Sequence, residues 1–360
     1  MVPYVLLLLI LFTFSILDLF KVGDNLRIGI WYISFLSLVL FSGLRYDVGM
    51  DYSSYKELYY DSFSGLNSEI KEIGWAFLFH FFCNIGCPFG IIVLLISFAS
   101  IFCMFKFIYR YSPYPFLSIL IFFCFTQYYT YSFNVMRQCL ATYVFLVSLK
   151  HIEERNFWSF TFTLLFLTIF VHTSSIILYP LYFVLHKRFS WWVKAILLLV
   201  ATLSSKFVIY LFLQSETYKI YLSFDNFSNA VSITTYILLL IGMSFFLLEI
   251  CIKKWSRREV ILLNMSFCFS VFLLITFVFE NTPLIIVFER IAYYFTPVLI
   301  VIIPMVIKRF FTDKSTFLLL PIVSIVYALF FCYTLDSGGV KNNLLPYKSI
   351  FSIIHKSDKL

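Results

Sequence analysis

Long apolar runs separated by short charged connectors make up most of this sequence. The runs cover residues 2–17, 28–44, 89–109, 114–132, 133–149, 157–171, 174–185, 191–213, 232–252, 260–279, 291–307 and 315–335. A membrane-spanning helix needs about 20 apolar residues, and several runs approach that length. The runs are continuous, whereas a membrane β-barrel alternates apolar and polar positions. The pattern predicts an all-α polytopic membrane protein with about 12 transmembrane helices, some short or broken, in one domain over residues 1–360.

The longest polar interval before the C-terminus follows the second run, at residues 45–73. The apolar segment 74–85 comes next, and it is shorter than the ~20 residues that a spanning helix needs. We therefore predict an extracytoplasmic loop over 45–88 that ends in a half-depth or interfacial helix at 74–85, with a membrane crossing as the alternative. Residues 336–360 are predicted to form an extracytoplasmic C-terminal tail.

Composition supports the membrane interpretation. Apolar residues make up 61% of the chain and charged residues 13%, and the mean hydropathy is +0.92, whereas about a quarter of a soluble domain is charged. The net charge of +8 lies largely in connectors between apolar runs, which is typical of membrane orientation and does not indicate a nucleic-acid partner. The connectors 150–155, 186–188, 253–258 and 308–314 are basic, so we expect them to face the cytoplasm.

That orientation collects charged and polar residues at the opposite face. The candidates are Arg45, Asp47, Asp51, Asn134, Arg137, Gln138, His172, Glu289, Arg290 and Tyr294. Asn134, Arg137 and Gln138 have the i, i+3, i+4 spacing that shares one helix face. An arginine at the start of a membrane helix is costly, so it is a functional candidate by default. If 133–149 and 157–171 form a hairpin, Arg137 and His172 lie at the same membrane surface.

Three arginines in this set suggest a site for a phosphorylated ligand, because guanidinium binds phosphate through two parallel hydrogen bonds. A carboxylate or His172 could act as a general base. The eight cysteines lie mostly within apolar runs and show no metal-ligand spacing, so we predict no metal and no cofactor. Structural alternatives stay open: Arg137 pairs with Glu289 or another acid, Arg45 anchors a helix at the interface, and Glu69 and Glu72 are plain surface charge.

The order of short motifs resembles a known family. The motifs are GLRYDVGMDYSSY (43–55), EIGWAFLFHFF (72–82), NVMRQCLATYVFLVSLKHIEERNFWSF (134–160), FVHTSS (170–175), ERIAYYF (289–295) and NNLLPY (342–347). Together they resemble the EpsG family, which belongs to the Wzy-type polymerases of bacterial O-antigen and exopolysaccharide synthesis.

The resemblance implies a metal-independent glycosyltransferase of the C-type membrane architecture, in the bacterial inner membrane with its active site facing the periplasm. Its partners would be undecaprenyl-diphosphate-linked oligosaccharides as donor and acceptor, and the resemblance allows a chain-length regulator protein. We expect Arg137 and Arg290, with Arg45, to hold the donor diphosphate, and His172 or Asp51 to accept the acceptor's proton. Further substrate-binding candidates are Asp47, Asn134, Gln138, Glu289 and Tyr294.

Two other classes of function stay open. A lipid-linked oligosaccharide flippase would also bind diphosphate through arginines, but it should line the full membrane depth and tends towards two similar halves. The sequence shows no internal repeat, and its polar residues collect at one face. An O-antigen ligase or a membrane O-acyltransferase is closer in chemistry, although the acyltransferase would need a histidine within reach of an acyl donor, often from the inner side.

Overall fold

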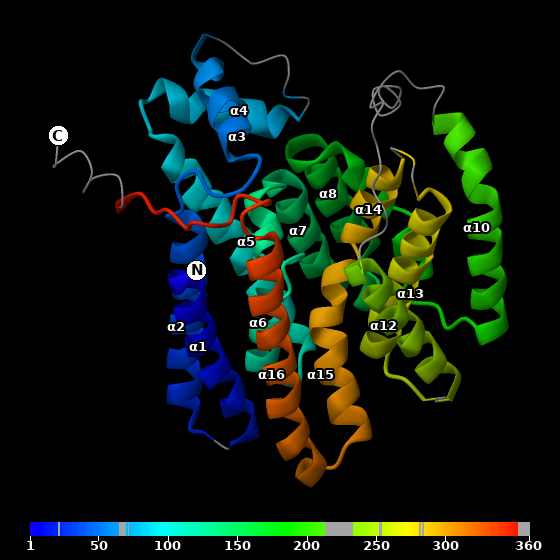
Figure 1. The fold of residues 1–360 in the computed structure, drawn as a ribbon. Coiled ribbons are helices and arrows are strands. Elements are labelled where there is room, and N and C mark those ends of the chain that lie inside the picture. The colour runs from blue at the N-terminus through cyan, green and yellow to red at the C-terminus, as the bar shows by residue number, and fades with distance from the viewer. Residues whose placement is uncertain are drawn as a thin grey trace. The chain divides into compact units, whose positions relative to one another are not determined.

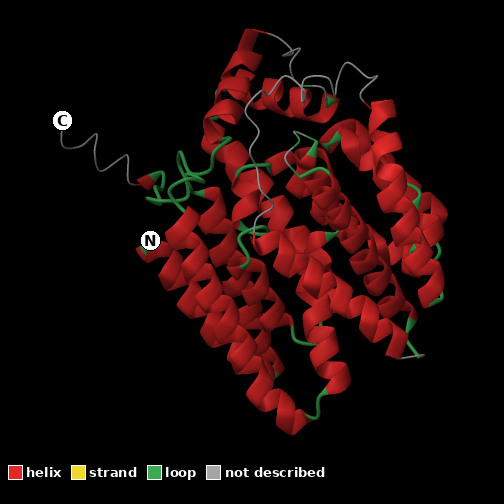
Figure 2. Cartoon of the chain, turned by 45° about the vertical axis from the view of Figure 1, so that its right-hand side comes forward, coloured by secondary structure: helices red, strands yellow, loops and turns green. Residues whose placement is uncertain are grey.

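The structure is a computed structural model that describes residues 1–20, 22–64, 70, 72–212, 233–251, 254–280, 282 and 284–351. Within these ranges every regular element is a helix (Figure 2). One isolated β-bridge joins Arg45 to Ser349. The prediction of an all-helical protein is confirmed for the described residues. The chain forms two compact units, the first from residues 1–151, 156–179 and 300–360, and the second from 152–155 and 180–299.

The first unit includes six apolar helices of different lengths (Figure 1). They are α1 (Val2–Ile16), α2 (Asp24–Gly43), α5 (Phe89–Tyr111), α6 (Pro115–Cys124), α15 (Leu299–Phe310) and α16 (Asp313–Gly338). Helix α2 packs along α5, and α1 packs along α6 and α16. The hydroxyls of Ser42 and Ser97 lie 2.8 Å apart between α2 and α5. Such contacts are typical of membrane helices, because small residues let backbones approach and hydroxyls bond across the interface.

The polar loop between α2 and α5 contains two helices, α3 (Tyr52–Asp61) and α4 (Ile73–Asn84). The short helix predicted at 74–85 is confirmed as α4, whereas α3 was not predicted. Tyr52, Tyr55 and Tyr59 are buried in α3 and pack with Trp75 and Phe79 of α4. Helix α3 is stable there because these tyrosines form one apolar stripe, although its remaining residues are mostly polar.

The central hairpin consists of α7 (Met136–Glu153) and α8 (Phe157–Phe166). Helix α8 continues as a π-helical turn (Leu167–Val171), and His172 then separates it from a 3₁₀ helix (Thr173–Leu178). The predicted break at His172 is confirmed.

The prediction of one helix over 114–132 was wrong, because α6 ends at Cys124. The Tyr143 hydroxyl donates to the carbonyl oxygen of Tyr128, at 2.9 Å, within the irregular segment that follows.

The second unit contains α9 (Leu181–Val184), α10 (Trp191–Phe212), α12 (Ile233–Cys251), α13 (Arg257–Val278) and α14 (Ile285–Tyr293). Lys194 on α10 is buried and bonds to Glu249 on α12. Ser256 and Glu259 form a capping box at the start of α13, in which each side chain bonds the other residue's backbone N–H.

Six helices among the described residues are long and apolar enough to cross a membrane. They are Val2–Leu19, Asp24–Gly43, Phe89–Tyr111, Arg257–Val278, Ile285–Phe310 and Asp313–Gly338. Shorter apolar helices accompany them at Ile73–Asn84, Pro115–Cys124, Phe157–Val171, Thr173–Val184, Trp191–Ser205 and Thr235–Glu249. The chain is therefore a polytopic membrane protein. The predicted number of crossings, the single membrane domain, and the sides of the 45–88 loop and the C-terminal tail stay predictions.

Candidate functional site

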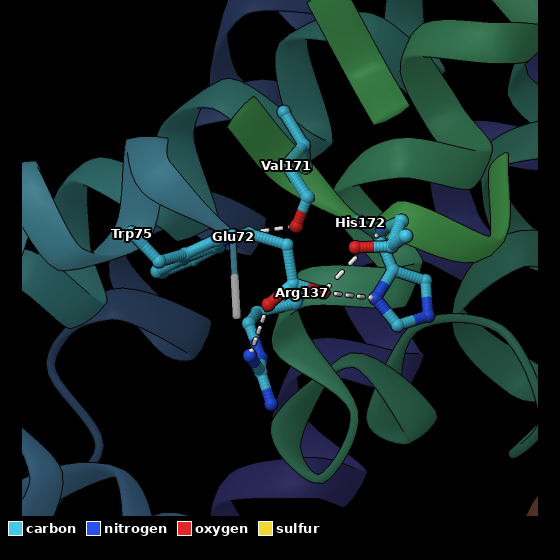
Figure 3. Close-up of polar contacts among 6 residues, drawn as sticks. Glu72, Trp75, Arg137, Val171 and His172 are labelled. Atoms are coloured by element: carbon cyan, nitrogen blue, oxygen red, sulfur yellow. Dashed lines mark hydrogen bonds and ion pairs between the residues drawn. The ribbon is translucent and has the colours of Figure 1, made fainter. Parts of the chain in front are cut away.

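A buried carboxylate, Glu72, joins the two residues that the central hairpin places near each other (Figure 3). Arg137 donates from Nη1 to Glu72 Oε2 at 2.6 Å, and His172 Nδ1 lies 3.2 Å from Glu72 Oε1. Glu72 precedes α4, Arg137 lies in the first turn of α7, and His172 lies in the break after the π-helical turn. All three belong to the first unit, so three distant parts of the sequence converge on one polar cluster.

Backbone packing fixes this convergence. A Cβ atom on Gly74 would lie 2.3 Å from the carbonyl oxygen of Phe170, so only glycine lets α4 approach the π-helical turn this closely. Trp75 donates from Nε1 to the carbonyl oxygen of Val171, at 2.7 Å. The backbone N–H of Thr173 approaches Glu72 Oε1 at 3.4 Å. Residues 72–75 therefore pack against residues 170–173 and form hydrogen bonds with them.

The electrostatics of the cluster keep Glu72 ionised. Burial by itself would raise the pKa of Glu72, but the hydrogen bond from His172 and the charge of Arg137 outweigh it and lower the pKa to about 2. The Glu72 side chain is only 6% exposed, whereas Arg137 is 28% exposed and His172 is 23% exposed. The carboxylate therefore lies inside, while both of its partners reach the surface of the cluster.

Tyr55 of α3 is a further neighbour of Arg137, in addition to Glu72. The guanidinium carbon of Arg137 is 5.7 Å from the centre of the Tyr55 ring. Burial raises the pKa of Tyr55, and the charge of Arg137 partly offsets that rise. Asp51, at the N-terminus of α3, is half-buried and close enough to Tyr55 to raise this pKa slightly. Asp51 thus lies near the cluster, and its predicted catalytic role stays a prediction.

Asn134 and Asp47 help to position the loop before α3. Asn134 accepts a hydrogen bond from the backbone N–H of Met50 through Oδ1, at 2.7 Å. Gly49 has φ +105°, and a Cβ there would lie 2.5 Å from the carbonyl oxygen of Phe133. Asp47 pairs with Lys348 at 3.0 Å, so the C-terminal segment also holds this loop. In this structure Asn134 bonds to the backbone of Met50 and Asp47 bonds to Lys348. The predicted contact of both side chains with substrate stays a prediction.

Arg45 follows α2 and is buried, whereas the sequence suggested a phosphate contact or a helix anchor at the membrane interface. Its side chain is 1% exposed and bonds to Ser42, and its Nη2 lies 3.3 Å from the sulfur of Met136. Its guanidinium carbon is 4.5 Å from the centre of the Phe133 ring. Burial lowers the pKa of Arg45 to about 10. Gln138 is also buried, at 3% exposure. The predicted substrate contacts of Arg45 and Gln138 stay predictions.

Three predicted residues belong to the second unit. Glu289 and Arg290 are exposed on α14, and Tyr294 follows that helix and is buried. Their participation in a site with Arg137 and His172 stays a prediction. The carboxylate that pairs with Arg137 in the described structure is Glu72.

Glu72 is the residue that sequence reasoning missed, and its interpretation as plain surface charge was wrong. Its position directly before the apolar helix of 73–84 was the available signal. Glu69 lies outside the described residues.

Among the residues that are described, no group of three or more His, Cys, Asp or Glu side chains could hold a metal ion. Cys83 and Cys87 are both free thiols.

Comparison with protein families gives a match to the EpsG family over residues 28–349, which is most of the chain. The chain belongs to the EpsG family. The matched region of this EpsG protein contains Glu72, Arg137 and His172. Comparison with curated proteins and with solved structures gives no match.

Proposed function

We propose that this EpsG protein is a polysaccharide polymerase. It transfers a growing glycan from undecaprenyl diphosphate to a hydroxyl of the next lipid-linked repeat unit, at the periplasmic face of the bacterial inner membrane. One observation supports this most strongly: in a membrane protein of this family, Arg137 and His172 meet on one buried carboxylate. A cation for a phosphate and a base for a hydroxyl are two groups that such a transfer can use.

Arg137 is the proposed contact to the donor diphosphate. A guanidinium has five N–H donors in a planar fork, and Glu72 accepts from Nη1. The 28% exposure of Arg137 lets other donors of the fork reach a ligand. As the bond between the anomeric carbon and the diphosphate oxygen breaks, negative charge grows on the leaving group, and a fixed cation stabilises that charge.

His172 is the proposed general base. It takes the proton of the acceptor hydroxyl while the oxygen of that hydroxyl forms the new bond to the anomeric carbon. The electron pair of the broken bond leaves with undecaprenyl diphosphate, and the proton on His172 returns to solvent. His172 is preferred over Asp51 because a carboxylate hydrogen-bonds its ring, as in other sites where histidine acts as base.

The periplasmic placement of the cluster rests on the basic connectors predicted to face the cytoplasm. The cluster belongs to the loop before α4, to the start of α7 and to the break after α8. With connector 150–155 in the cytoplasm, the far ends of this hairpin lie towards the periplasm. Cysteine labelling of an His172→Cys variant from outside the cell tests this placement, and labelling only after the inner membrane is opened would contradict it.

The lipid-linked glycans of a deletion strain test the function. The polymerase predicts single repeat units on the carrier and on the cell surface, with no long chains. A flippase would leave no glycan outside the cell, and a ligase would leave polymer on the lipid carrier. Complementation with an His172→Ala variant should not restore long chains at normal protein level. Complementation with an His186→Ala variant, changed in the second unit, should restore them.

A further inference from the structure

We propose that Glu72 is a positioning residue, which holds His172 with a proton on Nδ1 and so makes Nε2 the atom that receives the acceptor's proton. This inference rests on the proposed polymerase function and adds to it a residue and an assigned atom. The two oxygens of the Glu72 carboxylate have different partners, Arg137 and His172.

The contact between Glu72 and His172 fixes which ring nitrogen carries hydrogen. An ionised carboxylate only accepts hydrogen bonds, so the ring nitrogen 3.2 Å from Oε1 must donate. That nitrogen is Nδ1, whether the ring carries one proton or two. The second nitrogen, Nε2, lies on the far side of the ring from the carboxylate (Figure 3). Proton exchange with a substrate therefore takes place at Nε2.

The carboxylate cannot easily turn away from this arrangement. Its other oxygen, Oε2, accepts from Arg137 at 2.6 Å, and the backbone N–H of Thr173 approaches Oε1. The backbone of His172 is also held, because its N–H donates to the carbonyl oxygen of Leu167 at 2.7 Å. Both ends of the Glu72–His172 bond are thus fixed by separate contacts. A base whose partner is fixed this way loses little freedom when the substrate binds.

If Glu72 only held the fold together through its ion pair, its loss would not change the tautomer of His172; if it positions His172, the tautomer should change. The Glu72→Gln variant separates the two, because an amide has one oxygen and one NH₂ group. Arg137 can only donate, so it keeps the amide oxygen, and the NH₂ group then faces His172. Nδ1 must become the acceptor, the proton moves to Nε2, and the ring can no longer accept a proton there. The fold keeps the bond to Arg137, but the base is lost.

The tautomer can be measured without any activity assay. In purified full-length protein with ¹⁵N-labelled histidine, nuclear magnetic resonance distinguishes Nδ1–H from Nε2–H. The chain has five histidines, so an H172N variant identifies the His172 signals. We expect Nδ1–H in the wild type and Nε2–H in E72Q. Nε2–H in the wild type, or an unchanged tautomer in E72Q, would overturn the proposal.

The rate supplies the second measurement. With purified enzyme and lipid-linked repeat units, E72Q should lower kcat about 10²- to 10⁴-fold and leave KM for the donor nearly unchanged, which is the range for loss of a general base. The matched control is E153Q, which removes a carboxylate that pairs with Arg258 in the second unit, and it should keep the wild-type rate. A wild-type rate in E72Q overturns the positioning role. An inactive wild type that still shows Nδ1–H overturns the polymerase function instead.

Discussion

Replacement of Arg137 by lysine should weaken the contact with the donor phosphate while leaving the fold nearly unchanged. Lysine keeps the positive charge but carries it on one nitrogen. In the wild type the guanidinium bonds Glu72 through Nη1 and lies 28% exposed, so one side chain can contact Glu72 and a phosphate together. A lysine ammonium that stays with Glu72 has no second, separately placed nitrogen for the phosphate.

The expected loss follows from one charged hydrogen bond to the donor. Such a bond contributes about 1.5–3 kcal/mol, which corresponds to a decrease in kcat/KM of about 10- to 150-fold. Stability should change little, because the Glu72 charge keeps a cationic partner. The assay measures polymer formation by purified enzyme at several donor concentrations, together with the thermal melting temperature.

The control for this prediction is Arg258→Lys, because Arg258 also pairs with a glutamate, Glu153, but its side chain is 53% exposed and lies in the second unit. That variant should keep the wild-type rate. An Arg137→Lys enzyme with wild-type kcat/KM and normal melting would refute the diphosphate contact. A large loss of melting temperature in the same variant would show that Arg137 acts on the fold.

Three further predictions concern stability. Gly74→Ala should lower the free energy of unfolding by about 1–3 kcal/mol and reduce polymer formation, because the new Cβ would collide with the Phe170 carbonyl; an unchanged melting temperature would contradict the close approach. Because the folded state lowers the pKa of Glu72, ionised Glu72 stabilises the folded protein. This contribution is fully present above the unfolded pKa of about 4.5 and is lost as pH falls towards 2. The wild type should therefore exceed Glu72→Gln by at most about 3 kcal/mol between pH 6 and 8, and that difference should shrink below pH 4.5 in acid unfolding. Lys194→Ala should destabilise the protein by about 3–5 kcal/mol, since it leaves Glu249 without its partner, whereas Lys194→Met with Glu249→Leu should recover most of that loss in a melting experiment.

The sequence was informative where a membrane imposes simple rules. Apolar length and continuity predict the helices and the membrane class, and the short segment at 74–85 is a helix in the structure. The break at His172 was predictable because polar residues interrupt two apolar runs there. The proximity of Arg137 and His172 followed from the hairpin geometry alone.

Contacts between distant loops were not predictable in the same way. Glu72 looked like surface charge because acidic residues in loops usually are, and only the packing of Gly74 and Trp75 on the π-helical turn buries it. Arg45 was expected to bind phosphate or to anchor a helix at the membrane interface, yet serine oxygens, a thioether and an aromatic ring surround it. Helix α3 was missed because its buried tyrosines are spaced among polar residues, and the end of α6 at Cys124 has no glycine or proline to mark it.

Reconstitution of the purified protein in lipid vesicles, with one lipid-linked repeat unit as the only substrate, tests the proposed reaction most directly. A polymerase should give glycans that lengthen by whole repeat units and release one undecaprenyl diphosphate for each new linkage. Movement of intact repeat units across the vesicle membrane, with no lengthening and no released carrier, would contradict it.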